Sequence, residues 1–139
     1  MKTIIRGGLA VIIGLLVGGV VNMALILIGS HVIPPPPGVD VSDVHSMSAG
    51  MHLFQPKHFL FPFLAHACGT LVGSALAYLL AASHRRWYSY GIGVASLAGG
   101  IAAACMIPAP NWFIVTDLVL AYIPMACLGA RLGRCFVGK

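Results

Sequence analysis

Residues 59–107 read FLFPFLAHACGTLVGSALAYLLAASHRRWYSYGIGVASLAGGIAAACMI, and this stretch decides the fold class. It contains two apolar runs, 59–83 and 87–107, each close to the roughly 20 residues that a helix needs to cross the hydrocarbon of a bilayer. Arg85 and Arg86 stand in the short connection between them. Because so short a connection makes consecutive helices pack antiparallel, the stretch predicts a helical hairpin that crosses a membrane twice.

Two further apolar runs, 4–29 and 112–132, complete a set of four. The first is too long for the apolar part of a signal peptide and precedes no A-x-A cleavage site, so we interpret it as a span. Of the 139 residues, 59% are hydrophobic and 8% are charged, and the mean hydropathy of +0.95 lies far above that of soluble domains. The sequence therefore predicts an all-α integral membrane protein, in which residues 1–139 form one transmembrane domain, a four-helix up-down bundle.

The few charged residues orient these predicted spans. Seven of the eight Lys and Arg residues fall on one side, namely Lys2, Arg6, Arg85, Arg86, Arg131, Arg134 and Lys139. Cytoplasmic flanks are rich in such residues, so both termini are expected in the cytoplasm and the loop 30–58 in the periplasm, in a bacterial inner membrane. The net charge of +5 does not indicate nucleic-acid binding, because no polar domain carries the basic residues.

Small residues recur at four-residue spacing in every span. They are Gly14 and Gly18 in the first, Gly69, Gly73 and Ala77 in the second, Ala95, Gly99 and Ala103 in the third, and Gly129 and Gly133 in the fourth. Such stripes let helix backbones approach closely in lipid. We expect membrane lipid and further copies of the chain, in a homo-oligomer, as partners. Pro124 should kink the fourth span, since it lacks a backbone N–H.

The loop 30–58 is the one long polar segment. Ser42 is a suitable N-cap for a short amphipathic helix. One face of this helix would carry the apolar side chains Val44, Met47, Met51 and Phe54. We expect that face to lie on the bundle or in the membrane interface, as a lid.

The same loop carries Asp40, Asp43 and His45, which are candidate ligands for a divalent metal ion. No two histidines in the chain stand three or four residues apart, so a helical HxxxH chelate is absent. The alternative is that these side chains are solvated or cap the loop helix. A metal cofactor therefore remains a hypothesis that depends on the loop gathering the three residues.

Polar residues at similar depth in three predicted spans suggest an intramembrane site. Asn22, His66 and Asp117 each lie roughly 8–11 Å inside the outer boundary at 1.5 Å per residue, and Thr70 shares a helix face with His66. Ionisable groups at such depth are functional candidates. The alternatives are that Thr116 or Asp117 is the N-cap of a later-starting helix, that His66 bonds a backbone carbonyl, and that Asn22 joins two helices.

Three classes of function fit these features. The first is a transporter, channel or ligand-binding protein for a small molecule or ion, with Asn22, His66, Thr70 and Asp117 as its site. The second is an intramembrane enzyme acting on a lipid or quinone-like substrate, and the third is a structural or assembly protein. Because the chain has no HExxH, no GxSxG and no paired glutamates, the sequence favours transport or binding over catalysis.

Overall fold

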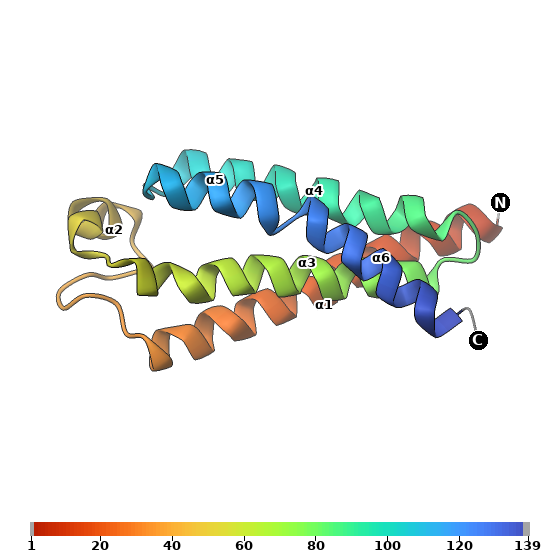
Figure 1. The fold of residues 1–139 in the computed structure, drawn as a ribbon, viewed down its shortest axis with the longest axis horizontal. Helices are drawn as coiled ribbons and strands as arrows, with labels where there is room; N and C mark the ends of the chain where they lie inside the picture. Colours follow the sequence, from red (N-terminus) through yellow and green to blue (C-terminus); the bar gives the residue numbers. More distant parts are fainter. Residues whose placement is uncertain (1, 138–139) are drawn as a thin grey trace.

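The computed structural model describes residues 2–137, which contain helices, turns and loops but no strand (Figure 1). The elements are α1 (Lys2–Val32), α2 (Val44–Gly50), η1 (Met51–Leu53), η2 (Pro56–Phe59), α3 (Leu60–Leu80), α4 (Arg85–Met106), α5 (Asn111–Leu120) and α6 (Ile123–Val137). Four helical segments are long and apolar enough to cross a membrane: Lys2–Val32, Pro56–Leu80, Arg85–Met106 and Asn111–Val137. The predicted all-α class with four such segments is confirmed.

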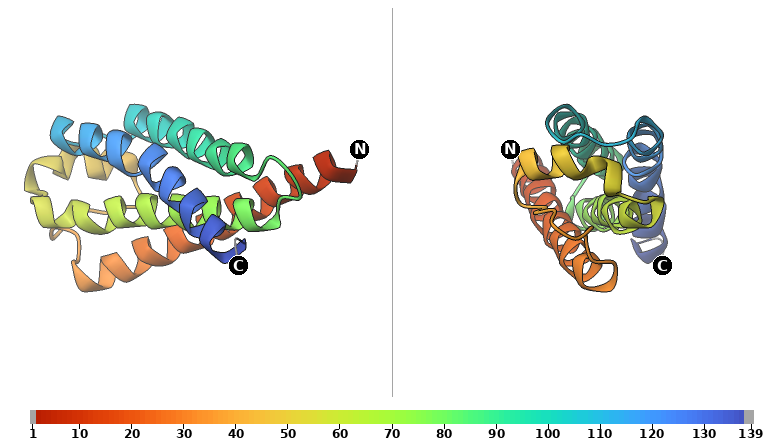
Figure 2. Two further views of the ribbon diagram at one scale, coloured as in Figure 1. Left: turned by 45° about the vertical axis from the view of Figure 1, so that its right-hand side comes forward. Right: turned by 90° about the vertical axis from the view of Figure 1, so that its left-hand side faces the viewer.

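The four long segments lie along one axis. Helix α3 packs against α1, α4 and α6, and it is the most buried of the long segments (Figures 1 and 2). The start of α1 and the end of α6 lie at one end of the molecule, here called the terminal end, and α2 lies at the other, here called the loop end. Helices α1 and α4 are close together near the terminal end, and α1 then diverges from α4 toward the loop end.

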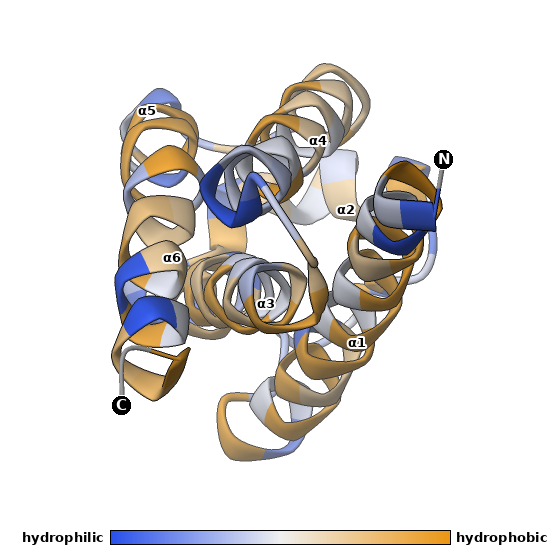
Figure 3. Ribbon diagram, turned by 90° about the vertical axis from the view of Figure 1, so that its right-hand side faces the viewer, coloured by the Kyte–Doolittle hydropathy of each residue, from blue (hydrophilic) through white to orange (hydrophobic). Residues whose placement is uncertain are grey.

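The surface around the long helices is apolar. Large hydrophobic side chains such as Leu16, Val20 and Val94 are 66%, 68% and 60% exposed. Figure 3 shows hydrophilic residues at the terminal end, at the start of α1, the start of α4 and the second half of α6, with hydrophobic residues over most of the helices between. An apolar flank of this size is what a lipid environment requires.

Glycines set the closest helix contact, between α1 and α3. A Cβ added to Gly14 or to Gly73 would lie 2.6 Å from the carbonyl oxygen of the other residue. Gly18 and Gly69 face each other in the same way, at 2.6 and 2.7 Å. Since real Cβ atoms do not come so near, only glycine permits this approach, and dispersion between the two backbones holds the pair together.

Hydroxyl groups join α3 to α4 in the terminal half of the bundle. The Ser74 hydroxyl donates to the Ser89 carbonyl oxygen at 3.2 Å, and the Ser89 hydroxyl donates to the Ser74 carbonyl oxygen at 2.9 Å. Both serines are fully buried. Helix α6 also packs closely on α3, where a Cβ added to Gly129 would lie 2.6 Å from the Leu71 carbonyl oxygen. The terminal half is therefore tightly packed.

The fourth apolar segment is interrupted, as Pro124 predicts. Helix α5 ends at Leu120, Ala121 and Tyr122 are not helical, and α6 begins at Ile123. A proline at position 124 cannot donate a backbone hydrogen bond to the carbonyl four residues earlier, so the helix breaks just before it. The interruption is a break between two helices, sharper than the expected kink.

The loop helix differs from the prediction at both ends. Asp43, and not Ser42, is the N-cap of α2, and its carboxylate accepts hydrogen bonds from the backbone N–H groups of His45 and Ser46. The α-helix ends at Gly50 and continues as the 3₁₀ turn η1. A Cβ on Gly50 would collide with the Val39 side chain, so the chain returning from the proline segment passes directly against this turn.

Candidate functional site

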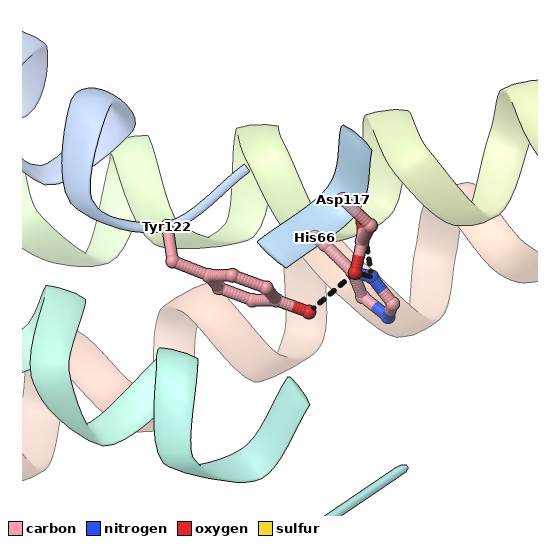
Figure 4. A network of polar contacts seen from close by, with 3 residues as sticks. All are labelled: His66, Asp117 and Tyr122. Atoms are coloured by element: carbon pink, nitrogen blue, oxygen red, sulfur yellow. Dashed lines mark hydrogen bonds and ion pairs between the residues drawn. The ribbon is translucent and has the colours of Figure 1, made fainter. Parts of the chain in front are cut away.

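His66 and Asp117 form a direct polar contact inside the bundle. The Nδ1 atom of His66 lies 2.9 Å from both carboxylate oxygens of Asp117. The Tyr122 hydroxyl donates a hydrogen bond to Asp117 Oδ2 at 2.9 Å, and the Tyr122 ring stacks on the His66 ring with centroids 5.7 Å apart (Figure 4). The Asp117 carboxylate is thus enclosed by two partners from different elements.

The break in the fourth segment builds this arrangement. Asp117 lies in α5, one turn before its end, and Tyr122 lies in the non-helical step that follows. The Tyr122 ring is 3% exposed and fits against α4 at Gly100, where any added Cβ would collide with it. A small residue on α4 and a break in the fourth segment are therefore both needed to bring the Tyr122 hydroxyl to Asp117.

Two cavities meet at His66. The first, here called the loop-side chamber, has a volume of about 350 Å³ and is bounded by Asp117, by Phe59 and Phe113, and by Met47 and Met51 of the loop. The second, here called the mid-bundle chamber, has a volume of about 290 Å³. Its walls include Gly18, Asn22, His66, Thr70, Ser96, Gly100 and Tyr122. His66, Gly100 and Ala103 border both chambers.

The mid-bundle chamber opens between α1 and α4. Gly19 on α1 and Gly99 on α4 both line it, and both are exposed. A Cβ added at either glycine would meet nothing within 4 Å. The opening therefore lies on the apolar flank of the bundle, between α1 and α4.

The predicted polar residues divide between these chambers. His66 and Asp117 are brought into contact, Asn22 and Thr70 share the mid-bundle chamber with His66, and Asp117 borders the loop-side chamber. Asp117 lies inside α5, which begins at Asn111, so the alternative of an N-cap at Asp117 is wrong. His66 contacts a carboxylate, and the alternative of a bond from its ring to a backbone carbonyl is not observed at Nδ1.

The loop residues considered as metal ligands have other roles. Asp43 caps α2, and Asp40 accepts hydrogen bonds from the Ser42 hydroxyl at 2.6 Å and from the Ser42 backbone N–H at 2.8 Å. These hydrogen bonds lower the pKa of the fully exposed Asp40 carboxyl. Within residues 2–137, no group of three or more His, Cys, Asp or Glu residues is placed to hold a metal ion, so Asp40, Asp43 and His45 do not gather as a site.

Sequence reasoning missed Tyr122. A tyrosine in a span is ordinarily assigned to the membrane interface, yet this one is buried beside the interruption at Pro124. The signal available in the sequence was its position next to Pro124, where a helix break is predicted. At a break, a side chain can point in a direction that a continuous helix would not allow.

Comparison of the chain with family models, curated proteins and solved structures finds no match.

Proposed function

We propose that this chain is an integral membrane protein that binds a small membrane-soluble molecule at His66, with the apolar part of that molecule in the two chambers. The observation that carries the proposal is the position of His66. Its ring is held through Nδ1 by Asp117, and it borders both an apolar chamber and one that opens toward lipid. Apolar pockets with few convergent polar groups are typical of ligand sites.

In this proposal the four apolar segments cross the bilayer as an up-down bundle. The terminal end carries Arg6, Arg85, Arg86, Arg131 and Arg134 and faces the cytoplasm, and the loop 30–58 faces the periplasm of a bacterial inner membrane. Small residues exposed on α4, among them Gly91, Ala95 and Ala102, favour a homo-oligomer. Light scattering of the detergent-solubilised protein, corrected for bound detergent, measures the number of chains.

Binding is favoured over conduction because the terminal half of the bundle is closed. Ser74 and Ser89 join α3 to α4 through reciprocal hydrogen bonds, and Gly14 contacts the backbone at Gly73. The mid-bundle chamber reaches toward these contacts from the loop side. A ligand at His66 therefore has a route to lipid between α1 and α4 but none toward the terminal end in this conformation.

Photochemical labelling tests the proposal. The protein in lipid nanodiscs is irradiated with hexadecanol that carries a diazirine on its alkyl chain, and labelled residues are identified by mass spectrometry. We expect saturable labelling of chamber residues such as Met47, Met51 and Ala103. Labelling of Leu16 and Val20, which are exposed on α1 and border neither chamber, should rise linearly with probe concentration.

A matched pair of variants on α1 controls this experiment. Gly19→Leu places a side chain in the mouth of the mid-bundle chamber, whereas Gly8→Leu adds the same side chain three turns away on the same helix face, outside both chambers. At both positions an added Cβ meets nothing within 4 Å, so neither change disturbs helix packing. Gly19→Leu should reduce chamber labelling and Gly8→Leu should not. Equal, non-saturable labelling of chamber and flank would contradict the proposal.

Acid–base catalysis on the bound molecule is a second candidate. A carboxylate that orients an imidazole from behind is an arrangement used for general acid–base chemistry, and the contact between Asp117 and His66 has that form. A catalytic role predicts that the molecule recovered from the protein is chemically changed and that His66→Gln prevents the change. Recovery of the unchanged molecule after prolonged incubation favours binding alone.

A further inference from the structure

The hydrogen-bonding capacity of the His66 ring is used on one side only. Nδ1 lies 2.9 Å from both oxygens of Asp117, and Oδ2 also accepts from Tyr122. Figure 4 shows the second ring nitrogen, Nε2, on the side of the ring turned away from the carboxylate. The His66 side chain is 25% exposed and the Asp117 side chain 7%, so the imidazole is the more accessible of the two groups. Nε2 is therefore the polar atom of this group that is available to a bound molecule.

The total charge of the site decides whether Nε2 donates or accepts a hydrogen bond. Among the residues that border the chambers, the titratable side chains are His58, His66, Asp117 and Tyr122, and neither lining includes a lysine or an arginine. His58 lies in η2 at the loop-side chamber, apart from the contact between Asp117 and His66. A net charge at membrane depth is costly, so His66 and Asp117 together should carry none.

Three uncharged arrangements of this pair are possible. The one with hydrogens on Asp117 and on Nδ1 is disfavoured, because the Tyr122 hydroxyl donates to Oδ2 and the carboxyl O–H is left without an acceptor. The other two both place a hydrogen on Nε2. In the first, a carboxylate faces an imidazolium, and both ring nitrogens carry hydrogen. In the second, a protonated Asp117 donates to Nδ1, and the neutral ring then carries its hydrogen on Nε2. Nε2 is a donor in either case and needs an acceptor from the ligand.

These constraints select one class of ligand. An anionic head would restore a net charge to the site, a cationic head would find the Asp117 oxygens already occupied, and a bare hydrocarbon would leave Nε2–H unpaired. The loop-side chamber offers Phe54, Phe59, Phe61 and Phe113 to an apolar body. We propose that the ligand is a neutral apolar molecule that presents an acceptor oxygen, such as a carbonyl oxygen, to the N–H at Nε2 of His66. This inference rests on the proposed binding function.

Competition among matched probes tests the inference. Three competitors of diazirine-hexadecanol labelling present a carbonyl group: 2-tetradecanone a ketone, methyl tridecanoate an ester and decylubiquinone a quinone. Two further competitors lack a neutral polar head, since tetradecane has no polar head and tetradecanoate has an anionic one. A carbonyl probe should compete at about a tenfold lower concentration than tetradecane, the ratio that one hydrogen bond of ordinary strength produces. The carbonyl probe that competes best identifies the chemical source.

Isotope-edited infrared spectroscopy gives a second, independent measurement. The ¹³C-carbonyl band of 2-tetradecanone in nanodiscs should acquire a component at lower wavenumber when the protein is present, because a hydrogen bond weakens the carbonyl bond. His66→Leu should abolish the component, and His66→Gln, which keeps an N–H donor, should retain part of it.

The outcomes separate this inference from the proposed function. Saturable labelling of the chambers by the alcohol, together with tetradecane or tetradecanoate competing as well as the ketone, would overturn the inference and leave the binding function standing. Labelling without any preference for the chambers would contradict the proposed binding function itself. An unchanged carbonyl band in the wild-type protein would overturn the inference whatever the labelling shows.

Discussion

Asp117 and Tyr122 meet only because the helix between them is broken. In an unbroken helix, side chains five residues apart point about 140° away from each other, so Tyr122 would be directed to another face. The break at Ala121 and Tyr122 removes that constraint, and the hydroxyl reaches Asp117 Oδ2 at 2.9 Å. Depth in the predicted spans was enough to select His66 and Asp117 from the sequence. Tyr122 could not be selected, because its partner depends on the exact place of the break.

Removal of the Tyr122 hydroxyl should cost little stability. We expect Tyr122→Phe to lower the free energy of unfolding by about 0.6 kcal/mol and at most by about 1.7 kcal/mol, the mean and the largest value measured for hydrogen bonds between membrane helices. Tyr90→Phe is the control, because Tyr90 packs edge-on against Trp87 near the start of α4. Unfolding in mixed micelles, followed by circular dichroism, measures both variants. A loss for Tyr122→Phe no larger than that for Tyr90→Phe would contradict the assigned hydrogen bond.

The carboxyl group of Asp40 should have a pKa below that of an ordinary aspartate. The Ser42 hydroxyl and backbone N–H lower the pKa of Asp40 in the folded loop, so these hydrogen bonds stabilise the fold above the ordinary aspartate pKa. This stabilisation is lost as the pH falls through the lowered value. Ser42→Ala should move the pKa of Asp40 back toward its ordinary value. Titration of the Asp40 carboxyl ¹³C resonance checks the direction of the shift.

Pairs of glycines determine how closely the long helices pack. The spacing in the sequence predicts a stripe of small residues on every span, but it does not predict which stripe faces another helix. Gly14 and Gly18 are opposite Gly73 and Gly69, whereas Gly19 and Gly99 face open space at the mouth of a chamber. Contact between these stripes depends on how α1 crosses α3, and the periodicity of a single helix does not predict that crossing. The sequence therefore predicts the presence of close contacts but not the opening between α1 and α4.

A methyl group between α1 and α3 should destabilise the bundle. Gly73→Ala puts a Cβ 2.6 Å from the Gly14 carbonyl oxygen, and the two helices must separate to admit it. Overpacking of this kind costs about 1–3 kcal/mol. Gly8→Ala adds the same methyl group where nothing lies within 4 Å and should be neutral or slightly stabilising. Equal unfolding free energies for the two variants would show that α1 and α3 do not approach this closely.

At the scale of the whole molecule, hydropathy and charge predicted the four apolar helices and one basic end. Both are properties of long segments, so they can be predicted from the sequence of each segment alone. The chambers are different, because they arise where α1 diverges from α4 and where the loop carrying Met47 and Met51 crosses the open end. The loop helix was predicted, but its exact cap and length were not, since Asp43 caps the helix while the Ser42 hydroxyl donates to Asp40.

The proposed orientation predicts opposite accessibility for the two ends. In a cysteine-free background, Asp43→Cys should react with a membrane-impermeant maleimide added to spheroplasts. Arg134→Cys should react only after the membrane is permeabilised, because the basic end faces the cytoplasm. The reverse pattern would contradict the assigned orientation.

The position of the ligand's polar group relative to His66 tests the central claim most directly. Solid-state NMR on nanodisc-embedded protein measures the dipolar coupling between ¹³C at the first carbon of hexadecanol and ¹⁵Nε2 of His66. We expect a coupling that corresponds to a hydrogen-bonded pair, and its loss in Gly19→Leu but not in Gly8→Leu. No coupling in the wild-type protein at saturating hexadecanol would contradict a binding site at His66.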